Sequence, residues 1–257
     1  EFRRVLFRSP PVISDDALIA SYHAPHPSFG NVSHMEHIDG AGIDLQLISP
    51  RPFHAMHSER PTRIVEWFTA ETNNIIKRTT ELFPGRFKGV AGIPQSPYLT
   101  VEQWLPERRR AVTELGFVGA MVNSDPYEGT EVPPAMGERY WYPLYEALCE
   151  LDVPMLLHSA GCKFPAREPY SLHFIQEETV SVWSMIQANV FADFPDLKVI
   201  VAHGGGAIPY QMGRFLPSVV RTGVSYLDKL RNFYFDSCLY TQDSLELLMK
   251  AVGTDRV

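Results

Sequence analysis

Two histidines that each follow a short apolar run are the residues of this sequence best placed to do chemistry. His158 comes directly after Met155–Leu157, and His203 comes directly after Val199–Ala202. An imidazole binds divalent metals and transfers protons near neutral pH. Parallel strands of an α/β barrel place the side chains at their carboxyl ends around one catalytic mouth. One such histidine is as often a structural imidazole bonded to a backbone carbonyl, but two together indicate a site.

The residues that follow His203 favour the same interpretation. Gly204–Gly206 present no Cβ to a ligand, and free amides at the start of a following helix attract anionic groups. The alternative is a tight turn between a strand and a helix. Asp236 ends a third apolar run, Phe233–Phe235, where a carboxylate either acts in the site or holds a turn. We therefore expect His203 and Asp236 to be catalytic.

These groups need a sheet to bring them together, and six apolar segments predict its strands. Each segment is rich in Val, Ile, Leu or Phe with almost no alternation, as in parallel strands covered on both faces. The expected strands are Leu45–Ser49, Phe87–Ile93, Phe117–Asn123, Val153–Ser159, Lys198–His203 and Phe233–Asp236. The expected helices are about Val32–Ala41, Thr62–Leu82, Val101–Leu115, Glu138–Glu150, Thr179–Phe191, Ala207–Phe215 and Ser244–Ala251. This alternation predicts an α/β fold, a (β/α)8 TIM barrel with six of its eight strands visible.

Composition limits the classes of protein to which the chain can belong. Its 257 residues are 45% apolar and carry a net charge of −7, so we expect one folded domain that does not bind nucleic acid. No apolar run approaches the roughly twenty residues that a membrane span needs. Cys149, Cys162 and Cys238 are odd in number and widely spaced, which favours a reducing cytoplasm. The aromatic residues Trp141 and Tyr142, if exposed, leave room for a homo-oligomer contact.

The two ends of the chain do not fit the barrel pattern. Residues 1–10 have neither the apolar core nor the cleavage site of a signal peptide, so we expect a non-native leader followed by one partial barrel domain at 11–257. Asp255–Val257 is expected to begin a further strand that does not continue. The first and last strands of the barrel are therefore expected to be missing from the chain.

Several short motifs together resemble the second amidohydrolase family. The resemblance runs from about Ser33 to Val257, and the combination is specific although each motif alone is not. The motifs are Ile48–Arg51, Pro94–Pro97, Glu114–Gly119, Arg139–Leu144, Glu150–Pro154, Phe191–Leu197 and His203–Tyr210.

The resemblance implies a metal-dependent hydrolase barrel with one divalent metal, usually zinc. In the family, a His-x-His pair on the first strand, a histidine on the fifth and a carboxylate on the eighth hold the metal. His158 matches the fifth-strand ligand, and His203 matches the histidine that lies beside the metal and polarises substrate or water. The His-x-His pair and the eighth-strand carboxylate have no counterpart in the chain. We therefore expect the 257-residue polypeptide by itself to bind metal weakly and to show no turnover.

Residues after the other strands are candidates for binding a small anionic substrate. Arg51 is the first of these, because arginine binds a carboxylate through two parallel hydrogen bonds, although a surface ion pair is the alternative. His173 lies in the segment after His158 where the family's hydratase offers an acid/base tyrosine. The remaining candidates, chosen by their position after predicted strands, are His54, Asn123, Asp125 and Arg214.

Within the family, the resemblance is strongest to members that add water to an unsaturated oxo-polycarboxylate such as 4-oxalomesaconate, in aromatic-acid degradation. It therefore implies a metal-dependent hydratase. The alternative within the family is a decarboxylase of an aromatic or muconate-semialdehyde acid. A further alternative is a non-catalytic fragment or binding protein, because most of the metal ligands have no counterpart.

Overall fold

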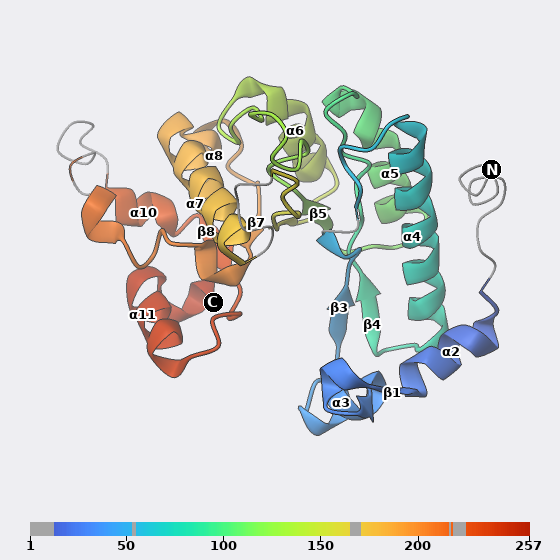
Figure 1. Cartoon of the computed structure of the whole chain (residues 1–257). Helices are drawn as coiled ribbons and strands as arrows, with labels where there is room; N and C mark the ends of the chain where they lie inside the picture. The colour runs from blue at the N-terminus through green and yellow to red at the C-terminus, as the bar shows by residue number, and fades with distance from the viewer. Residues whose placement is uncertain (1–12, 53–54, 165–170, 216, 218–224) are drawn as a thin grey trace.

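Six parallel strands form the centre of the molecule. The computed structural model describes residues 13–52, 55–164, 171–215, 217 and 225–257. The strands are β3 (Gln46–Ile48), β4 (Phe87–Gly89), β5 (Ala120–Val122), β6 (Met155–Leu157), β7 (Val199–Val201) and β8 (Phe233–Phe235). They pair in chain order, with a bridge between Ala91 and Ala120 joining β4 to β5. Together they form an arc, with β3 and β4 on the right of Figure 1 and β7 and β8 on the left. All six predicted strands are therefore present.

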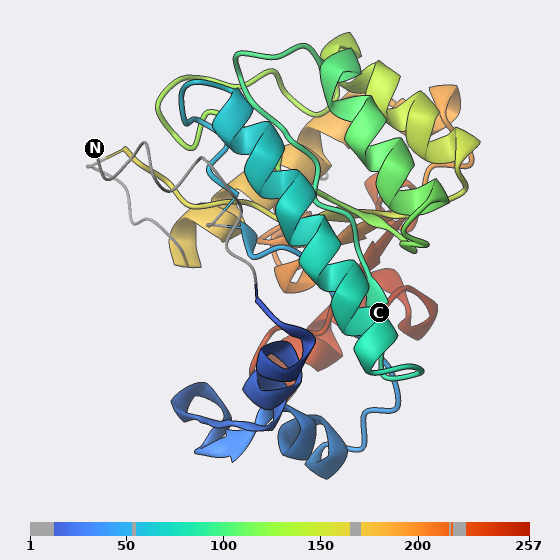
Figure 2. The same cartoon turned by 90° about the vertical axis from the view of Figure 1, so that its right-hand side faces the viewer.

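Helices follow the strands and cover the outer face of the arc. They are α4 (Arg63–Leu82), α5 (Val101–Thr113), α6 (Tyr142–Glu150), α7 (Ser171–Ala188), α8 (Val190–Asp193), α10 (Tyr226–Leu230) and α11 (Gln242–Val252). Before β3 lie α2 (Asp15–His23), α3 (His34–Gly40) and a small hairpin of β1 (Pro25–His26) and β2 (Val32–Ser33). The long helix α4 packs on β4 and reaches α2, as Figures 1 and 2 show.

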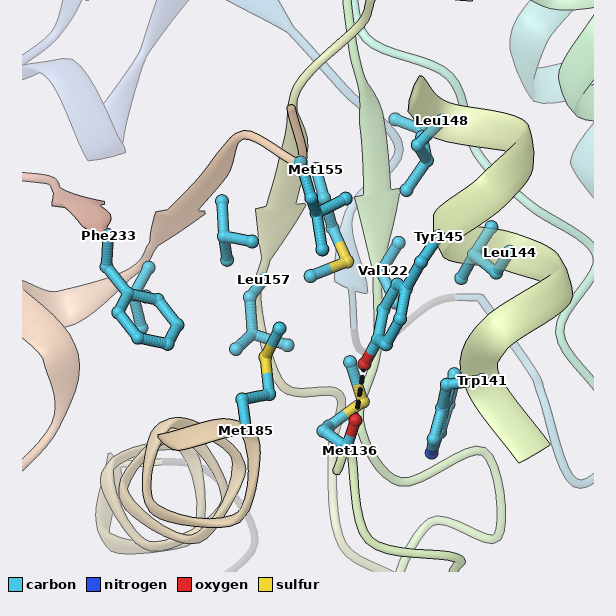
Figure 3. Packing of buried hydrophobic residues seen from close by; sticks show 14 of the residues in the cluster. Val122, Met136, Trp141, Leu144, Tyr145, Leu148, Met155, Leu157, Met185 and Phe233 are labelled. Atoms are coloured by element: carbon cyan, nitrogen blue, oxygen red, sulfur yellow. Dashed lines mark hydrogen bonds between the residues drawn. The ribbon is translucent and has the colours of Figure 1, made fainter. Parts of the chain in front are cut away.

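The hydrophobic core lies between the strands and these helices. Leu157, Val201 and Phe233 point toward the helices and are fully buried. Figure 3 shows Leu157 and Met155 facing Met185 of α7 and the side chains of α6. In the same core, the Tyr145 hydroxyl donates to the Met136 carbonyl at 2.6 Å, so its one polar atom is satisfied. Burial of this apolar layer supplies most of the favourable folding energy.

The inner face of the arc carries a second row of side chains. Met121, Leu156, Ile200 and Tyr234 are partners in register across four strands, and Leu47 is opposite Lys88 on the other two. Exposure rises toward the two ends of the row, from 5% at Met121 to 55% at Leu47 and 41% at Tyr234. The middle of the inner face is therefore shielded from solvent more fully than its two edges by the described residues.

Several expectations about local structure were wrong. The helix that we expected to begin at Thr179 begins at Ser171. Its first turns were missed because their apolar residues Leu172 and Ile175 are exposed and do not form a buried apolar stripe. Conversely, the helix expected from Ala207 is preceded by turns as far as residue 211. Helices α2 and α10 were not predicted.

The C-terminal residues and the expected subunit contact at Trp141 also differ from expectation. Thr254–Arg256 forms a 3₁₀ turn rather than the start of a strand. Trp141 is fully buried against Trp104, so it offers no surface for a subunit contact, and Tyr142 is half-buried with its hydroxyl on Asp193. The expected leader, residues 1–10, lies outside the described residues. In the part of the chain that is described, no helix is both long and apolar enough to span a bilayer.

Truncating a side chain should lower the free energy of unfolding by different amounts in the two rows of strand side chains. Leu157→Ala should lower the free energy of unfolding by about 3 kcal/mol, because it opens a cavity in a filled core. The matched control Leu47→Ala should cost less than about 1 kcal/mol, since Leu47 is already half exposed. Urea denaturation of both variants measures the difference, and equal losses would contradict this description of the core.

Candidate active site

His158, His203 and Asp236 meet at the carboxyl ends of three neighbouring strands. Pairing of Leu157 with Val201, and of Val201 with Phe235, brings the residues that follow to one edge of the sheet. The rings of His158 and His203 lie 4.8 Å apart between centroids. The Asp236 carboxylate accepts the Gly204 amide at 2.9 Å. The structure thus brings together the three residues that the sequence singled out first.

The ring of His158 is held in one tautomer. Its Nδ1 lies 2.8 Å from the Ser159 carbonyl oxygen, which can only accept, so Nδ1 carries the proton and Nε2 presents a lone pair. Burial lowers the pKa of His158 and keeps the ring neutral, with the nearby His203 acting in the same direction. A neutral imidazole with a fixed Nδ1–H is the form that binds a metal through Nε2.

The backbone that carries His203 is unusual. His203 has a φ of 50°, and Gly204, Gly205 and Gly206 have φ angles of 60°, 81° and 64°. A left-handed conformation is disfavoured for a residue with a Cβ, and such strain gathers at functional sites. A Cβ on Gly206 would lie 2.5 Å from Thr179 Oγ1 and 2.6 Å from the Ile175 carbonyl of α7. The glycines therefore allow both the turn and the close approach of α7.

The expectation that this turn offers free amides to an anion was wrong. The Gly204 amide donates to Asp236, and the Gly205 and Gly206 amides donate to carbonyls within the turn at 3.0 and 3.3 Å. The Ala207 amide donates to Thr179 Oγ1 at 2.8 Å. Because each donor is already used, the triplet serves the turn and the packing of α7.

Glu178 of α7 is a site residue that the sequence analysis did not predict. The side chain is 0% exposed, and its two carboxylate oxygens lie 2.9 and 3.0 Å from His203 Nδ1. Burial raises the pKa of Glu178 to about 7, although His203 acts in the opposite direction. The hydrogen bond to Glu178 in turn raises the pKa of His203. The available signal was a carboxylate on the apolar stripe formed by Phe174, Val182 and Met185.

Phe174 covers both histidine rings from one side. Its ring stacks on His203, with centroids 5.6 Å apart and planes 18° apart. The same ring meets His158 edge-on at 5.3 Å. The two imidazoles therefore lie in a partly apolar setting that limits how their rings can turn.

Asn123 and Asp125 use their side chains mainly to shape the loop after β5. The Asn123 amide donates to the Asp125 carbonyl at 2.8 Å, and its oxygen accepts the Ala160 amide at 3.1 Å. The Asp125 carboxylate accepts the amides of Tyr127 and Gly129 at 2.9 and 2.7 Å. Both side chains are buried, so their predicted contact with substrate stays a prediction.

The other predicted substrate residues occupy varied positions. Arg51 is exposed just after β3, and Arg214 is exposed in a helical segment after β7. His173 is only 2% exposed within α7. His54 lies outside the described residues.

Another buried carboxylate joins three of the loops that follow strands. Glu128, after β5, accepts hydrogen bonds from the amide and hydroxyl of Ser58, after β3, and from Lys163 Nζ, after β6, at 2.8 Å. The Lys163 amide also donates to the Glu128 carbonyl at 2.7 Å. Burial acts to raise the pKa of Glu128, but the bonds from Lys163 and Ser58 outweigh it and lower the pKa. We call these three residues the loop latch.

The chain matches a known protein family. Residues 20–257 match the family described as Amidohydrolase. The chain belongs to this family. It is 36% identical over 250 residues to the 2-keto-4-carboxy-3-hexenedioate hydratase of Sphingobium sp. strain SYK-6, covering 96% of the chain and 71% of the relative. It is also 29% identical over 243 residues to the γ-resorcylate decarboxylase of Polaromonas sp. strain JS666, covering 86% and 72%.

Solved structures of family members superpose well on the chain. The 4-oxalomesaconate hydratase of Rhodopseudomonas palustris matches with a TM-score of 0.82 and 32% identity, over 97% of this chain and 69% of that one. A dihydroxybenzoic acid decarboxylase from Polaromonas sp., with bound manganese and 2-nitroresorcinol, matches with a TM-score of 0.70 and 25% identity, over 87% and 72%. The predicted barrel class and the predicted family are confirmed, and the chain is an amidohydrolase-superfamily enzyme.

Removing the cation of the loop latch should cost more folding stability than removing its carboxylate. Lys163→Met should lower the free energy of unfolding by about 3 kcal/mol, because it leaves a buried carboxylate without its cation. Glu128→Gln should cost about 1 kcal/mol, since the Lys163 ammonium is 43% exposed and still bonded to Glu59. Chemical denaturation of both variants tests this order, and a larger loss for Glu128→Gln would contradict it.

Proposed function

We propose that the chain catalyses the addition of water to the carbon–carbon double bond of an unsaturated oxo-polycarboxylate. The observation that carries the proposal is the His203 side chain, whose Nδ1 is bound by a buried carboxylate and whose other nitrogen is left to exchange a proton. The two hydratase relatives, at 36% and 32% identity, support this reaction over others in the family.

The chain's own residues account for the proton transfers of such a reaction. The water oxygen forms a bond to one carbon of the double bond, while Nε2 of His203 accepts one of the water protons. The other carbon then takes up a proton, which the His203 imidazolium supplies, so that one water is added in total. Glu178 and Asp236 both raise the pKa of His203 and so stabilise its charged form during the reaction.

We further propose that the site takes one divalent metal with His158 as a ligand. The Nδ1–H tautomer of His158, fixed by the Ser159 carbonyl, leaves Nε2 ready for a metal. Within the described ranges, no three His, Cys, Asp or Glu side chains gather closely enough to hold a metal, so His158 supplies a single ligand of a larger set. Imidazole ligands suit zinc, while the solved decarboxylase contains manganese. When bound, such a metal lowers the pKa of water toward about 7.

The proposed substrate is a small anion, which needs local positive charge in a chain whose net charge is −7. The exposed arginines Arg51 and Arg214 follow β3 and β7 and are our candidates for this role, because a guanidinium binds carboxylates in a bidentate manner. The described cysteines are all free, which supports a reducing compartment, and we propose the cytoplasm.

Decarboxylation is the second candidate reaction, because the Polaromonas relatives are decarboxylases of dihydroxybenzoic acids. In that case the His203 imidazolium protonates the carbon that loses carbon dioxide. The stacked ring of Phe174 would then lie beside an aromatic substrate.

An activity assay separates the two reactions. The chain, expressed from its complete gene, should consume an unsaturated oxo-tricarboxylate with uptake of one solvent deuteron and no release of carbon dioxide. His203→Asn should lower kcat by about 10²- to 10⁴-fold, because it removes the proton acceptor. The surface variant His37→Asn is the control and should keep full activity. Release of carbon dioxide from dihydroxybenzoates without hydration would favour the decarboxylase instead.

Metal content tests the role of His158 independently of turnover. His158→Ala, expressed from the same gene, should retain at least tenfold less zinc or manganese after dialysis than the parent protein, as expected when a ligand is lost. Elemental analysis gives the stoichiometry, and unchanged metal content would remove His158 from the ligand set.

A further inference from the structure

His203 is contacted by two residues that lie one turn apart on α7. Phe174 and Glu178 are four positions apart, so they share one face of the helix. Phe174 stacks on the flat face of the His203 ring at 5.6 Å. Glu178 bonds the Nδ1 edge of the same ring at 2.9 Å. One contact restricts tilting of the ring and the other restricts its rotation about the Cβ–Cγ bond.

The Glu178 contact also selects where the His203 proton resides. When Glu178 is ionised it has no proton to donate, so in that state the hydrogen bond requires that Nδ1 of His203 carry the hydrogen. A neutral imidazole then has its lone pair on Nε2, which is the atom that the hydration reaction needs as proton acceptor. The same carboxylate faces the positive charge that appears on the ring when Nε2 takes a proton.

The surroundings of Glu178 argue against a purely structural role, because burying its charge costs folding free energy. Its carboxylate is fully buried on the face of α7 that also buries Ser181, Val182 and Met185. Besides the His203 ring, the donor that reaches it in the described part of the chain is the Ser159 amide, at a long 3.5 Å. A leucine at this position would fill similar volume without the desolvation cost of a charge.

We propose that Glu178 is a positioning residue that fixes the Nδ1–H tautomer and orientation of His203, with Phe174 as the second contact. This inference rests on the proposed function for its catalytic consequence, because it assumes that His203 Nε2 accepts a proton. The structural part of the inference, that Glu178 fixes the tautomer of His203, does not depend on the identity of any substrate.

Nitrogen NMR of the histidine rings tests the structural content directly. In protein labelled with ¹⁵N-histidine, two-bond proton–nitrogen correlations distinguish the Nδ1–H from the Nε2–H tautomer, and His203→Gln identifies the His203 signals. The parent protein should show Nδ1–H. Glu178→Leu should lose this pattern, because no acceptor remains, whereas Glu178→Gln should keep it through its amide oxygen. Glu177→Gln is the matched control, a neighbouring buried glutamate, and should leave the His203 signals in place.

Kinetics then test the catalytic consequence with the complete gene product. Glu178→Leu should lower kcat by about 100-fold while KM changes less than about threefold, and Glu178→Gln should recover part of that loss. Urea denaturation of both variants confirms that they are folded. An Nε2–H pattern in the parent, or an unchanged pattern in Glu178→Leu, would overturn the inference. If the NMR results hold but the parent hydrates no unsaturated oxo-acid, the proposed function fails and the positioning role stands.

Discussion

In-register parallel pairing of β6, β7 and β8 is the constraint on which the site depends. Parallel strands that start at the same level also end at the same level, so residues distant in sequence arrive at one edge without a dedicated loop. His158, His203 and Asp236 are brought together in this way. The helix that connects β6 to β7 must return along the outside of the sheet, which is how α7 comes to lie next to the strand ends it joins.

The buried carboxylates Glu128 and Glu178 show how different surroundings give one type of side chain different roles. Glu128 receives a lysine ammonium and a serine, so its charge is neutralised and its pKa falls. Glu178 has an imidazole as its main partner, so burial dominates and its pKa rises to about 7. The first arrangement suits a permanent ion pair that joins loops. The second keeps a carboxylate close to the point of exchanging a proton with its partner.

The strand-end residues could be predicted from sequence because the pattern that marks them is local. An apolar run of a few residues followed by a histidine or aspartate needs no tertiary information, and all six runs are strands. Glu178 could not be found this way, since a helical glutamate is normally solvated and its burial depends on a histidine 25 positions away. The same limit explains Trp141, whose burial depends on Trp104 of another helix. The glycine triplet suggested an anion site because nothing in the sequence reveals that Asp236 and Thr179 already use two of the neighbouring amides.

The left-handed run at residues 203–206 has a consequence for how the site could be altered. Because a Cβ on Gly206 would lie 2.5 Å from Thr179 Oγ1 and 2.6 Å from the Ile175 carbonyl, α7 approaches this turn too closely for any side chain at position 206. His203 and Glu178 therefore lie on two closely packed segments, whereas the loops after β3, β5 and β6 are joined by the loop latch and by the hydrogen bond from the Lys163 amide to the Glu128 carbonyl. We therefore expect substitutions in the loop latch to leave the geometry of the His203–Glu178 pair in place.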